Sequence, residues 1–254
     1  MKRRVFLLAV FAAPSLVACD FKTAEVSAKA DGPEPLNYIE RFTGGAVPSD
    51  RLPLVVVLHG RGDVPENFTK RLEGYPGKAR FIYLEAPIDE GKGRGWFTFD
   101  RMPGGWKRTS DKVKLLGERV VVTVDALERA HQPLGKPVLT GFSQGAMVVY
   151  AAILAHPERF HAALPVSGAL FESSLPPDLE RLAPKLPPVI AFHGDEDPII
   201  SARASKEAVT MLDAYGAVAE VRTFPEIPHW IMGDMKNDLL AEIEKCVADS
   251  VARD

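Results

Sequence analysis

The chain has 254 residues, of which 46% are apolar and 26% charged, with 31 basic residues, 34 acidic residues and two cysteines. These proportions exclude a disordered or fibrous protein, and the length fits one large α/β domain. The charge balance creates no basic surface, so nucleic acid is not predicted as a partner. Two cysteines also exclude a disulfide-dense scaffold and a four-thiolate zinc site.

The N-terminal segment has the pattern of an export signal. Three basic residues at positions 2–4 precede an apolar run over residues 5–17 that is too short to cross a bilayer. The run ends in Leu16-Val17-Ala18-Cys19, which resembles the lipobox of bacterial lipoproteins. This resemblance implies cleavage before Cys19, attachment of lipid to Cys19, and an exported lipoprotein anchored at the extracytoplasmic face of a membrane. An ordinary secretory signal is the alternative, and the paired arginines leave both Sec and twin-arginine export open.

The rest of the chain reads as one domain on a short tether. We expect a signal peptide over residues 1–18, a polar, proline-terminated tether over 19–35 and a folded domain over 36–254. Apolar runs predict strands at 54–58, 81–84, 138–140, 162–166, 189–192 and 219–224, with an edge strand over 38–43. Helical spacing predicts a helix capped by Ser110, then helices over 144–155, 201–215 and 233–247. Two segments, 91–106 and 173–188, are predicted as loops.

This alternation of strands and helices predicts a mostly parallel sheet flanked by helices. Gly141-Phe142-Ser143-Gln144-Gly145 matches the G-x-S-x-G pattern at the junction of a predicted strand and helix. A sharp turn there exposes the serine hydroxyl beside a helix N-terminus, which favours developing negative charge. Ser143 is therefore the candidate nucleophile, and a glycine-flanked turn with an ordinary serine is the alternative.

A serine hydroxyl needs a base to take its proton and an acid to orient that base. Three acids, Asp195, Glu196 and Asp197, follow a predicted strand that comes after Ser143. We favour Asp197 because Pro198-Ile199-Ile200 closes the loop directly after it. His229 is the candidate base, since it lies between the last predicted strand and the last predicted helix. Among the other histidines, we expect His59 and His193 to hold turns and the rest, His131, His156 and His161, to lie on the surface.

The loop after the earliest buried strand reads His59-Gly60-Arg61-Gly62-Asp63. In the hydrolases that use G-x-S-x-G, this loop supplies one oxyanion-hole amide and the residue after the nucleophile supplies the other. The candidate donors are the backbone amides of Arg61 and Gln144. Nothing in the spacing of acids and histidines completes a metal site, and no metal or cofactor is predicted.

Taken together, residues 58–63, 95–97, 141–146 and 193–200, followed by His229, resemble the phospholipase/carboxylesterase family of α/β-hydrolases, which includes the acyl-protein thioesterases. The resemblance implies an α/β-hydrolase fold with a minimal lid. It assigns Ser143, Asp197 and His229 as the catalytic triad and the amides of Arg61 and Gln144 as the oxyanion pair. It also implies that Trp96 and Phe97 lie near the acyl pocket. Two departures, Trp230 after the base and the cation at Arg61, bear on acyl-chain preference, and Trp230 is expected to line the substrate pocket.

The sequence thus predicts a serine carboxylesterase that hydrolyses small to medium acyl esters, with a small-molecule ester as substrate and no protein partner identified. A secreted polyester depolymerase or feruloyl-type esterase is an alternative with the same triad. The alternative from another class is a catalytically silent, membrane-anchored binding lipoprotein.

Overall fold

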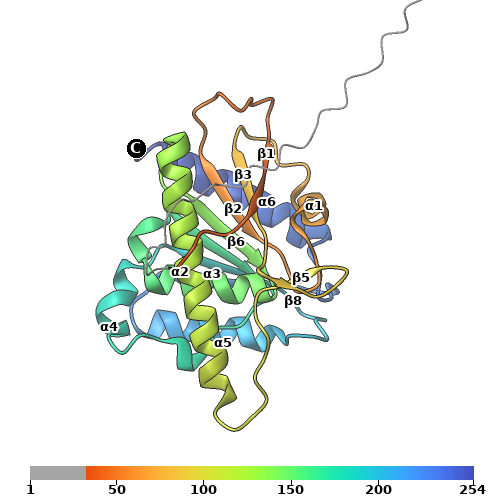
Figure 1. The fold of residues 1–254 in the computed structure, drawn as a ribbon, viewed down its shortest axis with the longest axis vertical. Coiled ribbons are helices and arrows are strands. Elements are labelled where there is room, and N and C mark those ends of the chain that lie inside the picture. Colours follow the sequence, from red (N-terminus) through yellow and green to blue (C-terminus); the bar gives the residue numbers. More distant parts are fainter. Residues whose placement is uncertain (1–32) are drawn as a thin grey trace, which may run out of the picture.

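A computed structural model describes residues 33–254 of the chain (Figure 1). The predicted signal peptide and the lipid-attachment residue Cys19 lie outside the described residues. Leu36, where the folded domain was expected to begin, is buried in the core, and its amide donates a hydrogen bond of 2.8 Å to the hydroxyl of Thr123.

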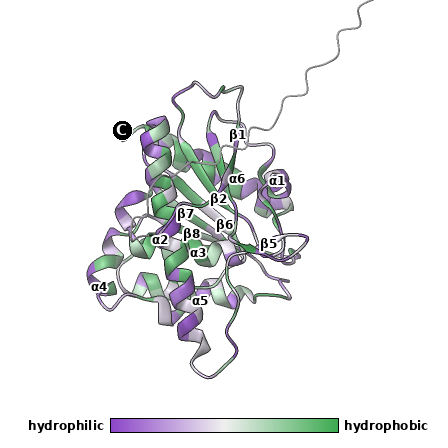
Figure 2. Ribbon diagram, viewed as in Figure 1, coloured by the Kyte–Doolittle hydropathy of each residue, from purple (hydrophilic) through white to green (hydrophobic). Residues whose placement is uncertain are grey.

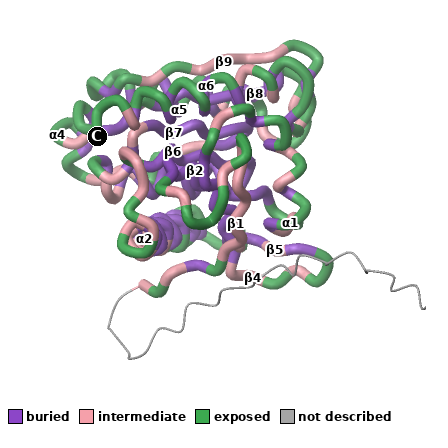
Figure 3. Tube along the Cα trace, turned by 90° about the horizontal axis from the view of Figure 1, so that it is seen from above, coloured by how far each residue is buried: buried purple, intermediate pink, exposed green. Residues whose placement is uncertain are grey.

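The centre of the molecule is a seven-stranded sheet with the strand order β1-β3-β2-β6-β7-β8-β9. Only β1 runs antiparallel to its neighbour, and every other pairing in this sheet is parallel. The strands are β1 (Tyr38–Phe42), β2 (Leu54–Leu58), β3 (Arg80–Leu84), β6 (Val138–Phe142), β7 (Ala162–Val166), β8 (Val189–Gly194) and β9 (Ala219–Phe224). Strands β2, β3, β6, β7 and β8 are buried along their whole length, as β-branched and apolar runs covered on both faces should be (Figure 3).

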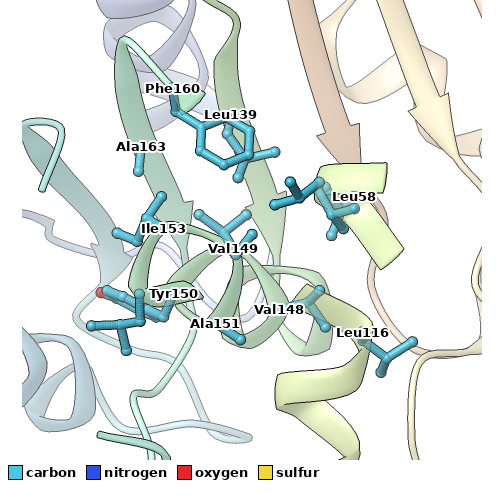
Figure 4. Packing of buried hydrophobic residues seen from close by; sticks show 14 of the residues in the cluster. Leu58, Leu116, Leu139, Val148, Val149, Tyr150, Ala151, Ile153, Phe160 and Ala163 are labelled. Atoms are coloured by element: carbon cyan, nitrogen blue, oxygen red, sulfur yellow. The ribbon is translucent and has the colours of Figure 1, made fainter. Parts of the chain in front are cut away.

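Helices cover both faces of this sheet. One apolar cluster joins the sheet to α2 (Gly105–His131), α3 (Gln144–Ala155), α4 (Leu179–Leu182) and α5 (Ala202–Ala214). Figure 4 shows the packing of α3 in this cluster, where Val149 and Ile153 lie close to Leu139 and Ala163 of the sheet. A second cluster joins the opposite face to α1 (Pro65–Phe68), the 3₁₀ turn η1 (Thr69–Leu72) and α6 (Gly233–Val251). The hydrophobic strands therefore lie between helices whose outer faces are polar (Figure 2).

The expected α/β-hydrolase architecture is confirmed, with two local differences. Helix α2 begins at Gly105, so the prediction of an N-cap at Ser110 was wrong; Ser110 is buried and its hydroxyl contacts that of Ser173. The first turn of α2 extends beyond the core and follows Gly104 in a left-handed conformation, so the periodic apolar stripe gives no sign of it.

The second difference concerns the segment 173–188 between β7 and β8. It was predicted as a loop but contains the end of η3 (Glu172–Ser174), helix α4 and the turn η4 (Ala183–Lys185). Four-residue helical turns are too short to show a period of 3.6. The segment 91–106, also predicted as a loop, contains β5 (Arg94–Gly95) and ends in the first residues of α2. Strand β5 pairs with β4 (Ile88–Asp89) in a hairpin, and the remaining short element is the turn η2 (Pro157–Arg159). Within residues 33–254, no helix combines the length and the apolar character that crossing a membrane requires.

Candidate active site

Ser143 occupies the turn between β6 and α3, at the carboxyl edge of the sheet. Its φ of 55° and ψ of −118° are unusual for a residue with a side chain, and such strain costs about 1–3 kcal/mol. The turn is compact because of its glycines: a Cβ on Gly145 would lie 2.4 Å from the carbonyl oxygen of Leu58. One on Gly141 would lie 2.7 Å from the backbone of Gly145. The fold therefore holds the serine in a strained conformation at the end of the central strand.

Two further loops bring an acid and a histidine to this serine. The Nε2 atom of His229, in the loop between β9 and α6, lies 2.9 Å from Ser143 Oγ. Its Nδ1 atom lies 2.6 Å from Asp197 Oδ2, in the loop after β8. Both separations are hydrogen-bond distances, so the three side chains form a continuous chain from a hydroxyl to a carboxylate. The ring of Phe142 packs against His229, with their centroids 4.7 Å apart.

The environment of Asp197 favours its charged form. Its side chain is fully buried, and Oδ1 accepts hydrogen bonds from the amides of Ile199 and Ile200, each at 2.9 Å. Burial by itself works to raise the pKa of Asp197. The hydrogen bonds from His229 and from these two amides outweigh that effect, and the pKa lies below its usual value. The neighbouring acids Asp195 and Glu196 are exposed, so the three candidate acids have distinct environments.

A second histidine contacts the same carboxylate. His193 is fully buried, and its Nε2 atom lies 3.3 Å from Asp197 Oδ2 and 2.8 Å from the carbonyl oxygen of Ile200. Its Nδ1 atom is 2.6 Å from the hydroxyl of Ser205 on α5. Burial lowers the pKa of His193, which favours a neutral ring that donates from Nε2. The role expected for it, holding a turn, is consistent with this position, but its contact with Asp197 had no sequence signal.

The loop after β2 is fixed by backbone contacts. The amide of Gly62 donates to the carbonyl of Arg94, and the amide of Arg94 donates to the carbonyl of Asp63. His59 bonds through Nδ1 to the carbonyl of Gly60 and accepts the amide of Ala86 at Nε2. In the described part of the chain, the amides of Arg61 and Gln144 have no acceptor within the protein. Both are thus available to an oxygen atom placed beside Ser143.

Trp96 and Phe97 are buried beside the site and do not face its cavity. Each is only 1% exposed, and neither lines the cavity next to Ser143. The side chain of Gln144 accepts the amide of Trp96 and donates to the carbonyl of Phe97, while the Trp96 indole donates to the carbonyl of His59. These bonds connect the start of α3 with the loop after β2. The structure therefore places the pair in the core, where they position the backbone around Ser143.

A cavity of about 340 Å³ opens at Ser143 and His229. Trp230 lines it, as expected, and so do two residues that lie in no recognisable motif, Phe68 and Arg71. Their segment, α1 and η1, has no periodicity long enough to be predicted from sequence. The other lining residues come from the loop after β2 and from the flanks of Ser143 and His229: Gly60, Arg61, Gly62, Asp63, Phe142 and Ile231.

Comparisons with known proteins identify the family of this chain. The family model described as Phospholipase/Carboxylesterase matches residues 47–247. An Oryza sativa subsp. japonica protein named "Probable carboxylesterase" is 24% identical over 198 residues, covering 71% of this chain and 82% of that protein. Acyl-protein thioesterase 1 of Kluyveromyces lactis is 28% identical over 202 residues, covering 71% of this chain and 84% of that protein.

Solved structures share the fold. The crystal structure of esterase PE8 superposes with a TM-score of 0.68 at 22% identity, covering 84% of this chain and 99% of that one. At this identity the likeness concerns the arrangement of strands and helices. The family match spans the loop after β2, the turn at Ser143 and both loops that carry Asp197 and His229. The chain belongs to the phospholipase/carboxylesterase family of α/β-hydrolase enzymes.

Proposed function

We propose that the protein is a serine carboxylesterase that hydrolyses small to medium carboxylic esters through Ser143, His229 and Asp197. The observation that carries this proposal is the hydrogen-bonded chain from Ser143 Oγ through His229 to the buried Asp197 carboxylate. This order of groups is the one that activates a serine hydroxyl for attack on a carbonyl. The cavity at Ser143 is lined in part by Phe68, Phe142 and Ile231, which suit the apolar part of an acyl or alkyl group.

The reaction proceeds in two steps. Ser143 Oγ attacks the ester carbonyl while His229 Nε2 takes its proton, and the Asp197 carboxylate stabilises the resulting imidazolium. The amides of Arg61 and Gln144 donate to the oxyanion, where loss of one donor costs about 3–4 kcal/mol of transition-state stabilisation. His229 returns the proton to the departing alcohol, which leaves an acyl-serine. A water molecule, deprotonated by His229, then hydrolyses this ester and releases the acid.

A fluorophosphonate probe tests the nucleophile. We expect it to label the wild-type protein stoichiometrically and to fail with Ser143→Ala. Ser167→Ala is a matched control and should be labelled like the wild type. Ser167 is also buried with a positive φ of 47°, but its hydroxyl has no hydrogen-bond partner in the described residues. Labelling of Ser143→Ala equal to wild type, or no labelling of the wild type, contradicts the proposal and favours a silent binding protein.

We propose in addition that the enzyme is an exported lipoprotein, anchored to a membrane by lipid on Cys19. The support is the sequence pattern at residues 2–19. Cys19→Ser should release the protein from the membrane fraction of cells while its esterase activity per molecule stays unchanged. Membrane association that persists in Cys19→Ser rejects the anchor and leaves the esterase proposal standing.

A further inference from the structure

The cavity beside Ser143 has an arginine in its wall that belongs to none of the motifs above. Arg71 lies on η1 and is half-buried. Its guanidinium carbon is 3.5 Å from the centroid of the Trp230 ring, which places the two groups in direct contact. Trp230 follows His229 in the chain, and both line the cavity with Arg71, so the cation lies in the same cavity as the base of the proposed reaction.

This arginine differs from its neighbour in the same wall. The guanidinium of Arg61 is paired with Glu90 at 2.9 Å, so its charge is already balanced. Within residues 33–254, the side chain of Arg71 has no hydrogen bond or ion pair, and its guanidinium contacts the aromatic face of Trp230. That contact uses the face of the guanidinium plane, so the N–H groups at its edge remain available to a ligand.

From this arrangement we infer that the cavity binds a carboxylate carried by the substrate. The inference rests on the proposed esterase function and names its substrate class: esters in which a short apolar spacer separates a carboxylate from the scissile carbonyl. A planar carboxylate accepts two parallel N–H groups from an arginine fork. Phe68, Phe142 and Ile231 provide apolar walls for the spacer.

One acidic side chain limits where the charge can lie. Asp63 also lines the cavity, and its Oδ1 accepts the amide of Val64 at 2.9 Å. A bound anion is repelled by Asp63 and attracted by Arg71, so the proposed position of the carboxylate is beside the Arg71 guanidinium. The cavity volume of about 340 Å³ is at the small end of the range for ligand pockets and accommodates a carboxylate on a short chain or on one aromatic ring.

Two pairs of esters test the inference on either side of the scissile bond. In the first pair the acyl group carries the charge: mono-4-nitrophenyl glutarate against its methyl ester. In the second pair the alcohol carries it: 4-acetoxybenzoate against its methyl ester. For each pair, the quantity to compare is kcat/KM of the charged ester divided by kcat/KM of its methyl ester. In at least one pair, we expect Arg71→Gln to lower this ratio about tenfold from its wild-type value, mainly by raising KM for the charged ester. Raised salt should lower the ratio of the wild type.

The controls separate this inference from the proposed function. Lys70→Gln removes an exposed charge from the same turn and should leave the ratios within twofold of wild type. Arg71→Lys keeps the charge without the planar fork and should give an intermediate ratio. Hydrolysis of neutral esters with ratios unchanged in Arg71→Gln overturns the carboxylate site alone, whereas no hydrolysis of any ester and no fluorophosphonate labelling overturn the esterase.

A measurement on the wild type guards against a variant that fails to fold. Benzoate should inhibit hydrolysis of a neutral ester competitively, at a concentration at least tenfold below that needed with benzamide. Equal inhibition by benzoate and benzamide contradicts the carboxylate site, because the two compounds differ in charge and share their shape.

Discussion

Both carboxylate oxygens of Asp197 have hydrogen-bond partners in the candidate site. Its two oxygen atoms have separate tasks: Oδ1 accepts two backbone amides, and Oδ2 faces His229 and His193. Since all these partners favour the anion, the carboxylate stays charged in a fully buried position. In the proposed reaction, this anion beside Nδ1 of His229 keeps Nε2 free to accept the proton of Ser143.

Replacing Asp197 with Asn should remove the negative charge beside His229 while keeping a side chain of nearly the same size and shape. We expect kcat on a neutral ester to fall about 10³-fold or more, because an amide no longer stabilises the imidazolium and can favour the wrong tautomer. KM should change little, since Asp197 is absent from the cavity wall. Steady-state kinetics at pH 7.5 would measure both constants, with circular dichroism to verify folding.

Asp195→Asn is the matched control for that variant. Asp195 lies two positions away, is exposed, and is 3.8 Å from Lys206 on α5. Its replacement should leave kcat within twofold of wild type. A large loss in Asp195→Asn, or a small one in Asp197→Asn, contradicts the assignment of the acid.

The sequence predicted those site residues whose chemistry depends on residue type. Ser143, Asp197 and His229 were selected by strand–loop context, and the structure brings these three side chains within hydrogen-bond distance of one another. The roles of Phe68 and Arg71 had no comparable signal, because a cavity wall is formed by tertiary packing. Trp96 and Phe97 were placed by resemblance to a family, which does not specify whether a side chain lines a cavity or supports its backbone.

Among the elements, α2 and α3 approach each other closely at a glycine, Gly117 of α2. A Cβ on Gly117 of α2 would lie 2.7 Å from the backbone of Ala151 on α3, well inside contact distance. Alanine favours a helix by about 1 kcal/mol over glycine, so propensity alone predicts that Gly117→Ala stabilises the protein. The contact predicts the opposite, because neither backbone can move without disturbing a close-packed cluster.

We expect Gly117→Ala to lower the free energy of unfolding by about 1–3 kcal/mol. Urea denaturation followed by circular dichroism would measure it. Leu115→Ala serves as a control, since Leu115 is 55% exposed on the same helix and should have little effect. Unchanged or increased stability in Gly117→Ala would mean that the two helices pack less closely than described.

The elements themselves were predictable to different extents. The buried strands β2, β6, β7 and β8 appear as apolar runs because helices cover both of their faces. The start of α2 at Gly105 lacks this signal because its first side chains are largely exposed. The short helices after β7 bury Leu179 and Ala183 but are too short for a helical period to show in the sequence.

At the scale of the whole molecule, a network of ion pairs connects α6 with the edge strand β9 of the sheet. Arg222 on β9 bonds to Glu242 at 2.9 Å and to Asp238 at 3.2 Å, both on α6. The Glu242 side chain is 7% exposed and also receives Lys245 at 3.2 Å. Helix α6 directly follows the loop of His229, so this network fixes the end of the segment that carries the base.

The pH dependence of folding stability should report this network. Burial works to raise the pKa of Glu242, but the bonds from Arg222 and Lys245 outweigh it and hold the pKa below its usual value. A carboxyl group whose pKa is lower in the folded protein stabilises the fold above its unfolded pKa and loses that effect as pH falls through the folded value. Glu242→Gln should therefore lower the free energy of unfolding by about 1–2 kcal/mol at pH 7 and at pH 5. The deficit should shrink by pH 3.5.

Urea titrations of both proteins at these three pH values would test this expectation, because other carboxyl groups affect the two proteins equally and cancel in the difference. Glu244→Gln is the matched control: Glu244 lies on the same helix and is exposed, with no ion pair in the described residues, so its removal should change stability by less than about 0.5 kcal/mol. A deficit in Glu242→Gln that stays constant down to pH 3.5 would assign the effect to packing. A deficit confined to acid pH would reverse the sign of the linkage and contradict the lowered pKa of Glu242.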